Sequence, residues 1–305
     1  MFKVIKQMDS VQTDSLTALI YGEPGIGKTS LAFTSEKPVL LDFDSGIQRA
    51  CYRQTSIRVE TWEDVIEFQR SKDFKEMKPR TLIIDTAGAM LDIYIADYVK
   101  NVDPKNKRRG GELSLQGYGA MKDSFNQFKS WAKTMKINLI FVAHTTTQED
   151  GGNIKFIPKV TGGSYDLLRQ ECDLIGYMYS NRNKRVIDFN PSDNHIGKNC
   201  AEFPIIDIPA YTASEYPTFF YNLIEKTLEK MNSLNENQVQ AVKKLSKFSE
   251  GLEIVEDVET VNGVLESIMK EKDRTLQLQM FSLLKTKASE HKIKYNGVTK
   301  LFEVE

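Results

Sequence analysis

A glycine-rich stretch near the amino terminus constrains the fold more than any other feature of this sequence. Residues 20–33 read IYGEPGIGKTSLAF, so that Gly22 and Gly27 bracket four residues and are followed by Lys28 and Thr29. The apolar residues 15–21 predict a short buried strand before the glycines, and residues 29–35 are suited to begin a helix after them. A strand, a tight glycine turn and a helix in this order form a loop whose backbone N–H groups surround phosphate oxygens.

This loop predicts a nucleotide site with a bound Mg²⁺. Lys28 is expected to reach the β- and γ-phosphates, and the hydroxyl of Thr29 is expected to bind the metal. The residues expected to contact the nucleotide are Gly22, Glu23, Pro24, Gly25, Ile26, Gly27, Lys28, Thr29 and Ser30. The alternative is a chance glycine-rich turn, which the complete Gly-Lys-Thr sequence and its flanks disfavour.

A second metal ligand is expected at the end of a neighbouring hydrophobic strand. Residues 81–85 read TLIID, four strand-forming residues followed by Asp85. Because residues 87–99 have a helical pattern, Asp85 could also cap that helix. The metal role is the favoured interpretation, and the two are compatible.

The nucleotide is expected to be ATP. The sequence DTAG at residues 85–88 matches the second motif of a GTPase, but a GTPase also needs Asn-Lys-x-Asp to bind guanine. Residues 106–109 (NKRR) and 183–186 (NKRV) both lack the aspartate. A strict AAA+ protein usually has a glutamate directly after the metal-binding aspartate, whereas this chain has Thr86.

Three further strand patterns bear polar residues at or near one end. Residues 39–43 lead into Asp42 and Asp44, residues 138–143 precede His144, and residues 173–178 follow a glycine pair at 162–163. With the loop, the sequences LLDFD, IIDT, FVAHTT and TGGS resemble RecA-like phosphate-loop ATPases, which include AAA family ATP-binding proteins. More narrowly, residues 1–225 resemble phage proteins related to single-strand annealing recombinases of the Sak type.

The resemblance implies an α/β fold with a mostly parallel central sheet, and it assigns roles to two strand ends. Recombinases of the RecA type place a water-activating glutamate after the second strand. Asp44 matches that position and is preferred over Asp42 because it lies nearer the carboxyl end of the strand, where open α/β sheets bind ligands. His144 replaces the usual glutamine and is expected to sense the γ-phosphate; the alternative is a polar residue that only closes the strand.

Two segments are expected to bind single-stranded DNA, since the DNA-binding loops of RecA-like proteins follow the same two elements. The first is a basic loop at residues 105–111, and the second is a long polar connector at residues 145–163. Basic residues beside an aromatic ring can hold phosphate and stack a base. The alternative interpretation is two solvated surface loops. The expected DNA contacts are Lys105, Lys107, Arg108, Arg109, Lys155, Phe156 and Lys159.

Phosphoryl transfer also needs a cation for the charge that develops on the γ-phosphate, and a neighbouring subunit can supply it. Lys198 is the candidate because residues 193–199 read as a flexible stretch between late strands at 185–189 and 205–206. Arg185 is the alternative, although the first residue of a strand is more simply a surface charge. The expected assembly is a homo-oligomeric ring or filament with ATP sites between subunits.

The carboxyl-terminal quarter is expected to be a separate helical module. A polar break at residues 232–237 (NSLNEN) divides an ATPase core at 1–231 from a module at 232–305. The module has helical apolar spacing but no catalytic signature. Its apolar positions are Val261, Leu265, Ile268, Leu276, Met280, Leu283 and Leu284.

Composition limits the partners and the compartment. The 305 residues have a formal net charge of −1, so any attraction to nucleic acid must come from local patches. The three cysteines have no metal-binding spacing. Because no apolar run approaches the roughly 18–20 residues that cross a bilayer, a cytoplasmic protein without a membrane partner is expected, in the host cytoplasm if a phage encodes it.

The first functional hypothesis is therefore a Mg²⁺-dependent ATPase that acts on single-stranded DNA in phage recombination or replication, by strand annealing or recombinase-like action. The second is an ATP-driven helicase or helicase loader. The third is a nucleotide-binding regulator or small-molecule kinase without a DNA role. Single-strand binding protein and other phage replication proteins are the further candidate partners.

Overall fold

The computed structural model describes residues 12–150 and 152–304. The chain forms two compact units, one of which spans Thr13–Met231. The other contains the residues from Asn232 onward. Among the described residues, the larger unit contains two apolar core clusters and the smaller unit contains a third.

The larger unit contains one mixed sheet, to which ten strands of the described residues contribute. The strand order is β10-β8-β7-β1-β5-β4-β2-β3, with β6 beside β5 and β9 beside β7. The six strands from β7 to β3 run parallel, whereas β6, β8, β9 and β10 pair antiparallel with their neighbours. The expected α/β fold with a mostly parallel central sheet is confirmed. The strands are β1 (Thr17–Gly22), β2 (Pro38–Asp42), β3 (Ser56–Arg58), β4 (Thr81–Asp85), β5 (Asn138–Asp150), β6 (Asn153–Pro158), β7 (Leu174–Asn181), β8 (Lys184–Asp188), β9 (Lys198–Asn199) and β10 (Ile206–Asp207).

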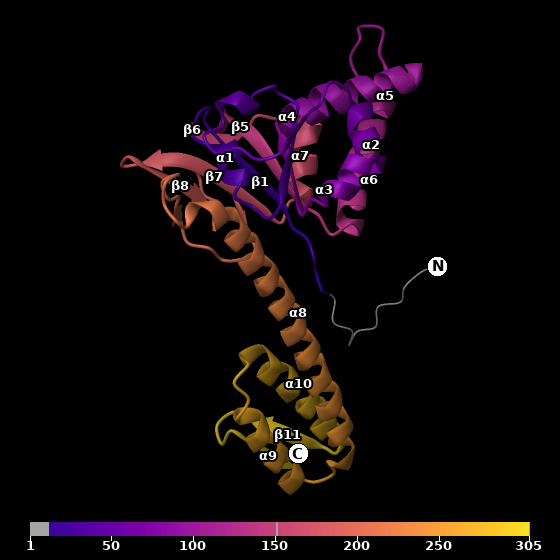
Figure 1. Ribbon diagram of the computed structural model, residues 1–305. Helices are drawn as coiled ribbons and strands as arrows, with labels where there is room; N and C mark the ends of the chain where they lie inside the picture. The colour runs from indigo at the N-terminus through magenta and orange to yellow at the C-terminus, as the bar shows by residue number, and fades with distance from the viewer. Residues whose placement is uncertain (1–11, 151, 305) are drawn as a thin grey trace. The chain divides into compact units, whose positions relative to one another are not determined.

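Helices cover both faces of this sheet (Figure 1). One face packs against α2 (Trp62–Arg70), α3 (Lys72–Met77), α5 (Ala96–Val102), α6 (Leu115–Thr134) and α7 (Gly162–Glu171). The short α4 (Ala87–Ala89) continues through a π-helical turn (Met90–Ile95) into α5. The other face packs against α1 (Lys28–Ala32) and the beginning of α8 (Phe219–Gly251).

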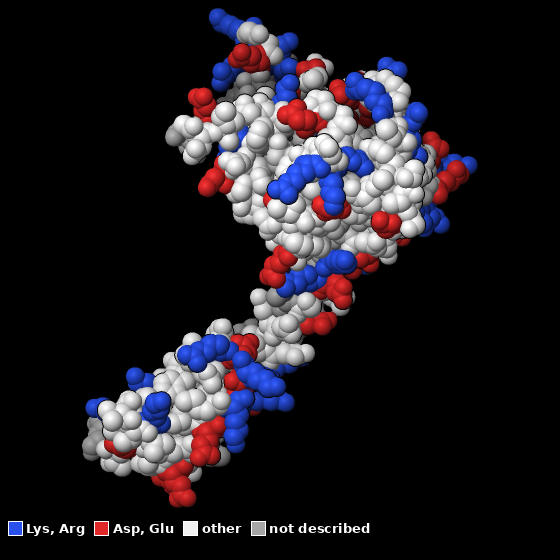
Figure 2. All heavy atoms as spheres, turned by 90° about the vertical axis from the view of Figure 1, so that its left-hand side faces the viewer, with Lys and Arg blue, Asp and Glu red and all other residues white. Residues whose placement is uncertain are grey.

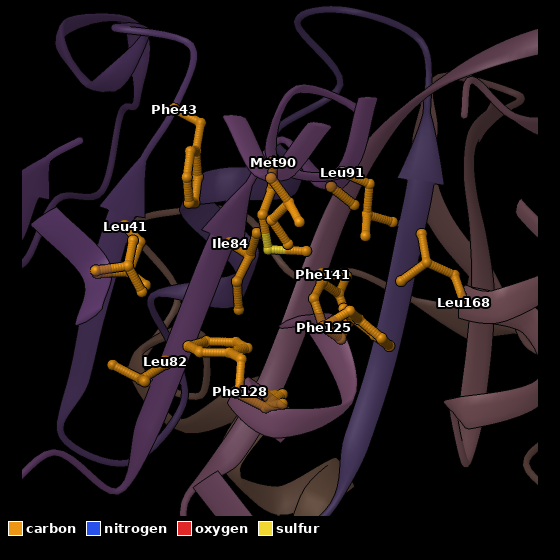
Figure 3. Packing of buried hydrophobic residues seen from close by; sticks show 14 of the residues in the cluster. Leu41, Phe43, Leu82, Ile84, Met90, Leu91, Phe125, Phe128, Phe141 and Leu168 are labelled. Carbon is orange, nitrogen blue, oxygen red and sulfur yellow. The ribbon is translucent and has the colours of Figure 1, made fainter. Parts of the chain in front are cut away.

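Alternation along the strands divides the apolar residues between these two faces. Ile84 and Phe141 belong to the first core, where they meet Met90 and Phe125 (Figure 3). Ile83, next to Ile84 in the chain, belongs to the second core. Successive side chains of a strand point to opposite faces, so strands covered on both sides read as continuous apolar runs. This arrangement explains why the central strands are recognisable in the sequence.

The strand register brings the polar strand ends to one edge of the sheet. Gly22 at the end of β1 pairs with His144 on β5, and Asp42 at the end of β2 pairs with Asp85 at the end of β4. β5 lies between the loop-bearing strand β1 and the aspartate-bearing strand β4. The phosphate loop, both acids and His144 therefore gather at the carboxyl edge, where parallel α/β sheets bind ligands.

Three local expectations from the sequence are wrong. The segment 145–163 is not a connector, because β5 continues to Asp150 and pairs with β6 as a hairpin. The stretch 193–199 is not a free loop, because Lys198 and Asn199 form β9 against β7. The polar break at residues 232–237 does not interrupt the helix, since α8 runs continuously to Gly251.

The smaller unit combines helices with a β-hairpin. Its elements include α9 (Val258–Met269), α10 (Arg274–Glu290), β11 (Ile293–Asn296) and β12 (Leu301–Val304). All but one of the predicted apolar positions are buried in its core: Val261, Leu265, Ile268, Leu276, Met280 and Leu284. Leu283 is exposed instead, because it lies on the outer face of α10. The hairpin closes that core through Ile293 and Phe302, so the module is not purely helical. Among the described residues, no helix has the length and apolar character needed to span a bilayer.

Candidate functional site

The glycine-rich loop connects β1 to α1 at the carboxyl edge of the sheet. Gly25 and Gly27 have φ values of 81° and 98°, in the left-handed region that glycine adopts without a steric penalty. This backbone borders a cavity of about 400 Å³. The cavity is lined by Pro24, Gly25, Gly27, Lys28, Thr29, Ser30, Asp44, Gly46, Arg49, Ala50, Cys51, Asp85, His144 and Tyr211.

Lys28 is buried beneath the loop. Its Nζ donates to the carbonyl oxygens of Gly22 and Glu23, each at 2.9 Å. Burial lowers the pKa of Lys28 to about 8, while the nearby charges of Asp85 and Glu23 oppose the shift. A buried ammonium held by neutral carbonyls is well suited to exchange them for phosphate oxygens, since hydrogen bonds between charged groups are the stronger ones.

Thr29 and Asp85 come together from two different elements. The hydroxyl of Thr29, on α1, donates to Oδ2 of Asp85, at the end of β4, across 2.6 Å. Burial raises the pKa of Asp85 to about 6, and the carboxylates of Asp42 and Asp44 add to this rise. Mg²⁺ prefers oxygen ligands beside nucleotide phosphates, and a hydroxyl and a carboxylate are such ligands. The nearby carboxylates of Asp42 and Asp44 add negative charge that favours a cation. These residues therefore fit a Mg²⁺ ion.

The two acids near the end of β2 have different surroundings. The carboxylate of Asp42 is buried and accepts from the backbone N–H groups of Gly46 at 3.1 Å and Ile47 at 3.4 Å. Asp44 instead lines the cavity and makes an exposed ion pair of 3.5 Å with Arg49. Asp42 thus stabilises the turn after β2, and Asp44 is the acid that faces the cavity.

His144 lies between the cavity and the sheet. Its Nε2 is 4.0 Å from Oδ2 of Asp44, and its buried Nδ1 has no hydrogen-bond partner among the residues that the structure describes. Burial lowers the pKa of His144, and the charge of Lys28 lowers it further. A neutral imidazole at this position has ring nitrogens that can bond to a phosphate oxygen or a water.

A second cavity, of about 360 Å³, shares Asp44 and His144 with the first. Lys159, predicted to bind DNA, lines this second cavity together with Thr86 and Asp92. The backbone N–H of Lys159 donates to the carbonyl of His144 at 2.7 Å. The base of the β5–β6 hairpin is therefore hydrogen-bonded to the residue expected to sense the γ-phosphate.

The basic loop between α5 and α6 is exposed. Asn106 anchors it, because its side chain donates to the carbonyl of Val99 at 2.9 Å. Both charge signs are interspersed on the face in Figure 2, in keeping with the low net charge. The four basic side chains of the loop form no ion pair within the described part of the chain, and they line neither cavity described above: Lys105, Lys107, Arg108 and Arg109.

Two further predicted residues, Lys155 and Lys198, line a third cavity of about 340 Å³ together with Arg169. Lys198 pairs with Ile175 and does not line the cavity of about 400 Å³ beside the glycine-rich loop, which we call the phosphate cavity. The ring of Phe156 is half-buried and stacks on Tyr177 with the ring centroids 5.4 Å apart. The structure therefore brings Lys155 and Lys198 to one cavity, which none of the four basic side chains of the α5–α6 loop lines.

Cys51 and Tyr211 line the phosphate cavity, although neither was expected from the sequence. Arg185, the alternative candidate for the trans-acting cation, donates to the hydroxyl of Tyr211 at 2.6 Å beside Gly27. The backbone N–H of Cys51 donates to the hydroxyl of Ser30 at 3.1 Å, which fixes the segment after β2 on the cavity wall. Only tertiary contacts reveal these residues, because neither Cys51 nor Tyr211 lies within a recognisable motif.

Comparison with known proteins places most of the larger unit in a known family. Residues 14–201 match the model of a protein family described as an AAA domain. A protein of Bacillus subtilis (strain 168), described as "SPbeta prophage-derived uncharacterized protein YorG", is 22% identical over 224 residues. That alignment covers 68% of this chain and 66% of the relative, so the chain spans just under two thirds of the relative's length.

Proposed function

The chain belongs to the AAA domain family, and from this membership we propose that it is a Mg²⁺-dependent ATPase that acts on single-stranded DNA. The observation that carries the ATPase proposal is the 2.6 Å contact between Thr29 and Asp85 beside the buried Lys28. It unites the phosphate loop with a metal-binding acid from a different strand. AAA domains bind nucleotides, so the fold and the site support the same chemistry.

Each part of the site has a role in hydrolysis. Lys28 and the loop N–H groups would hold the β- and γ-phosphates, and Thr29 and Asp85 would hold Mg²⁺, which would balance the phosphate charge. Asp44 orients a water toward the γ-phosphate, and His144 senses that phosphate. Thr86 stands where a strict AAA+ protein has glutamate, so Asp44 is the acid proposed to position the water.

The α5–α6 loop supports the DNA part of the proposal. Its four exposed cations form no ion pair within the described residues, so they are free to bind phosphates without first losing a partner. The similarity to a prophage-derived protein supports a phage context. Strand annealing or recombinase-like action in phage recombination or replication is the proposed role, and a homo-oligomeric ring or filament is the proposed assembly.

ATP hydrolysis with and without single-stranded DNA tests the proposal. Wild-type protein is expected to hydrolyse ATP only with Mg²⁺, and single-stranded DNA is expected to raise the rate. Lys28→Ala should abolish turnover because the main phosphate cation is removed. Lys72→Ala, which changes an exposed lysine on α3, is the matched control and should behave as wild type.

The outcomes separate the rival functions. Hydrolysis by Lys28→Ala at the wild-type rate would overturn the ATPase proposal. A rate that DNA leaves unchanged would favour a nucleotide-binding regulator or a small-molecule kinase. Strand annealing without unwinding would support the recombination role, whereas ATP-dependent unwinding would identify a helicase motor.

A further inference from the structure

The phosphate cavity contains an aromatic residue that no part of the phosphate chemistry requires. Tyr211 lies beyond β10, lines the cavity and is 38% exposed. Its hydroxyl lies within 2.5 Å of the point where a Cβ on Gly27 would stand. Tyr211 therefore sits directly against the phosphate loop, although it is far from the loop in sequence.

Arg185 holds Tyr211 in this place through several contacts. Its Nη1 donates to the Tyr211 hydroxyl at 2.6 Å, and its Nη2 donates to the carbonyl of Pro209 at 3.0 Å. The backbone carbonyl of Arg185 accepts from the N–H of Ile208 at 2.8 Å. The guanidinium carbon also lies 4.2 Å from the centre of the Tyr211 ring. The guanidinium of Arg185 thus donates hydrogen bonds through two of its nitrogens and also packs on the Tyr211 ring, which restricts that ring to one orientation.

The ring of Tyr216 also packs against Tyr211. Tyr216 is fully buried, and its ring packs against Tyr211 at a centroid distance of 5.0 Å and an interplanar angle of 75°. Such an edge arrangement is one that aromatic pairs prefer. Tyr211 is thus a supported ring with part of its surface facing the cavity.

Residues of different chemistry line the cavity. Asp44, Asp85 and the hydroxyl of Thr29 all line it, and Thr29 bonds to Asp85, so the γ-phosphate and its metal are expected beside these acids. Cys51 also lines the cavity and adjoins Tyr211, whose described partners include Arg185 and Tyr216 and none of these acids. A nucleotide with its γ-phosphate beside the acids leaves its nucleoside to the remaining lining residues, among which Tyr211 supplies an aromatic ring.

We propose that Tyr211, held by Arg185, forms the nucleoside subsite of this cavity and contacts the base or ribose with its ring. This inference rests on the proposed nucleotide function and adds the part of the ligand that the phosphate loop does not recognise. Tyr211 is the contact residue, and Arg185 is a positioning residue that acts through it. Contact with an aromatic ring tolerates different bases because every base has an apolar face.

Binding of two ligands that differ only in the nucleoside tests this assignment. ADP contains the nucleoside, and inorganic tripolyphosphate does not; both are titrated with Mg²⁺ by calorimetry. Tyr211→Ala is expected to weaken ADP binding by roughly ten-fold or more, the scale of a lost aromatic–base contact, and to leave tripolyphosphate binding unchanged. Tyr211→Phe keeps the ring and should bind ADP nearly as wild type does.

Arg185→Met tests the positioning role. It should weaken ADP binding less than Tyr211→Ala does and should spare tripolyphosphate. If it weakens both ligands equally, Arg185 acts directly on phosphate and the positioning role is wrong. Unchanged ADP binding by Tyr211→Ala would overturn the subsite, and so would equal losses of ADP and tripolyphosphate.

Two controls separate this inference from the proposed function. Thermal unfolding shows whether each variant is folded, and Tyr211→Leu replaces Tyr211→Ala if the smaller side chain prevents folding. Lys28→Ala should lose both ligands. Wild-type protein that binds neither ligand would overturn the nucleotide function itself, whereas a failure of the Tyr211 variants alone would overturn only the subsite.

Discussion

Lys28 links nucleotide binding to pH at the residue scale. Burial lowers its pKa to about 8, so the apo protein loses this ammonium charge as the pH rises through that value. Phosphate oxygens favour the charged form, and nucleotide binding at about pH 8.5 should therefore take up protons. Calorimetry of ADP binding in two buffers with different ionisation enthalpies measures this uptake.

The matched control for this prediction is Lys28→Arg. A guanidinium stays protonated at these pH values, so proton uptake should disappear in that variant. Wild-type affinity for ADP should also fall above pH 8 and stay level between pH 6.5 and 7.5. Equal proton uptake by wild type and Lys28→Arg would show that another group titrates.

Asp42 and Asp44 should respond differently to loss of charge. Asp44→Asn is expected to keep ATP binding and to lower turnover by about 10²-fold or more, the usual scale for a positioned acid–base group. Asp42→Asn should lower thermal stability more than turnover, because its carboxylate accepts from Gly46 and Ile47 in the turn after β2. Turnover and melting temperature are measured for both variants. If Asp42→Asn loses turnover and Asp44→Asn loses stability instead, the two assignments are exchanged.

At the scale of elements, the α5–α6 loop is expected to carry the electrostatic part of DNA binding. Replacing Lys105, Lys107, Arg108 and Arg109 together with Gln should weaken single-strand binding. It should also reduce the slope of log affinity against log salt by about 0.7 for each lost phosphate contact. Fluorescence anisotropy across a salt series measures both quantities.

A matched set of charges lies on α2 and α3 and in the turn that follows. Arg70, Lys72, Lys75 and Lys78 are also exposed, and replacing them removes the same number of charges. This control should retain the wild-type affinity and salt slope. Equal losses in the two variants would indicate attraction by overall charge and would contradict a specific role for the α5–α6 loop.

At the scale of the whole molecule, assembly decides whether Lys198 reaches a nucleotide. It does not line the phosphate cavity of its own subunit, so any action on the γ-phosphate requires a neighbouring copy. Lys198→Ala should assemble and bind ATP yet hydrolyse it poorly, since a cation acting in trans contributes about 10³–10⁵ in rate. Mixing Lys198→Ala with Asp44→Asn should restore activity at interfaces that combine the two wild-type residues.

Light scattering and subunit exchange establish whether mixed assemblies form. If they form and activity does not return, Lys198 has no trans role. It would then belong functionally with Lys155 and Arg169 in the cavity that the three residues line.

The sequence by itself determined the parts of this protein that depend on local pattern. The spacing from Gly22 to Thr29 identifies the phosphate loop, and the four strand-forming residues before Asp85 identify the strand that carries the acid proposed to bind the metal. Strands buried on both faces are continuous apolar runs, which is why the central strands could be located in the sequence, whereas their mostly parallel arrangement was implied by the resemblance to RecA-like ATPases. These features need only a few neighbouring residues to be recognised.

The tertiary structure decided what depends on contacts between distant segments. Pairing with β6 turned the polar segment after His144 into a hairpin, and pairing with β7 placed Lys198 in a strand. Backbone N–H groups in the turn after β2 donate to the carboxylate of Asp42, whereas Asp44 lines the cavity. In the sheet, β7 lies beside β1, and β8 and β10 follow on the far side of β7. This strand order is what brings Arg185 and Tyr211 next to the phosphate loop. Side-chain partners across such distances are chosen by packing of the whole sheet, and no short stretch of sequence contains that information.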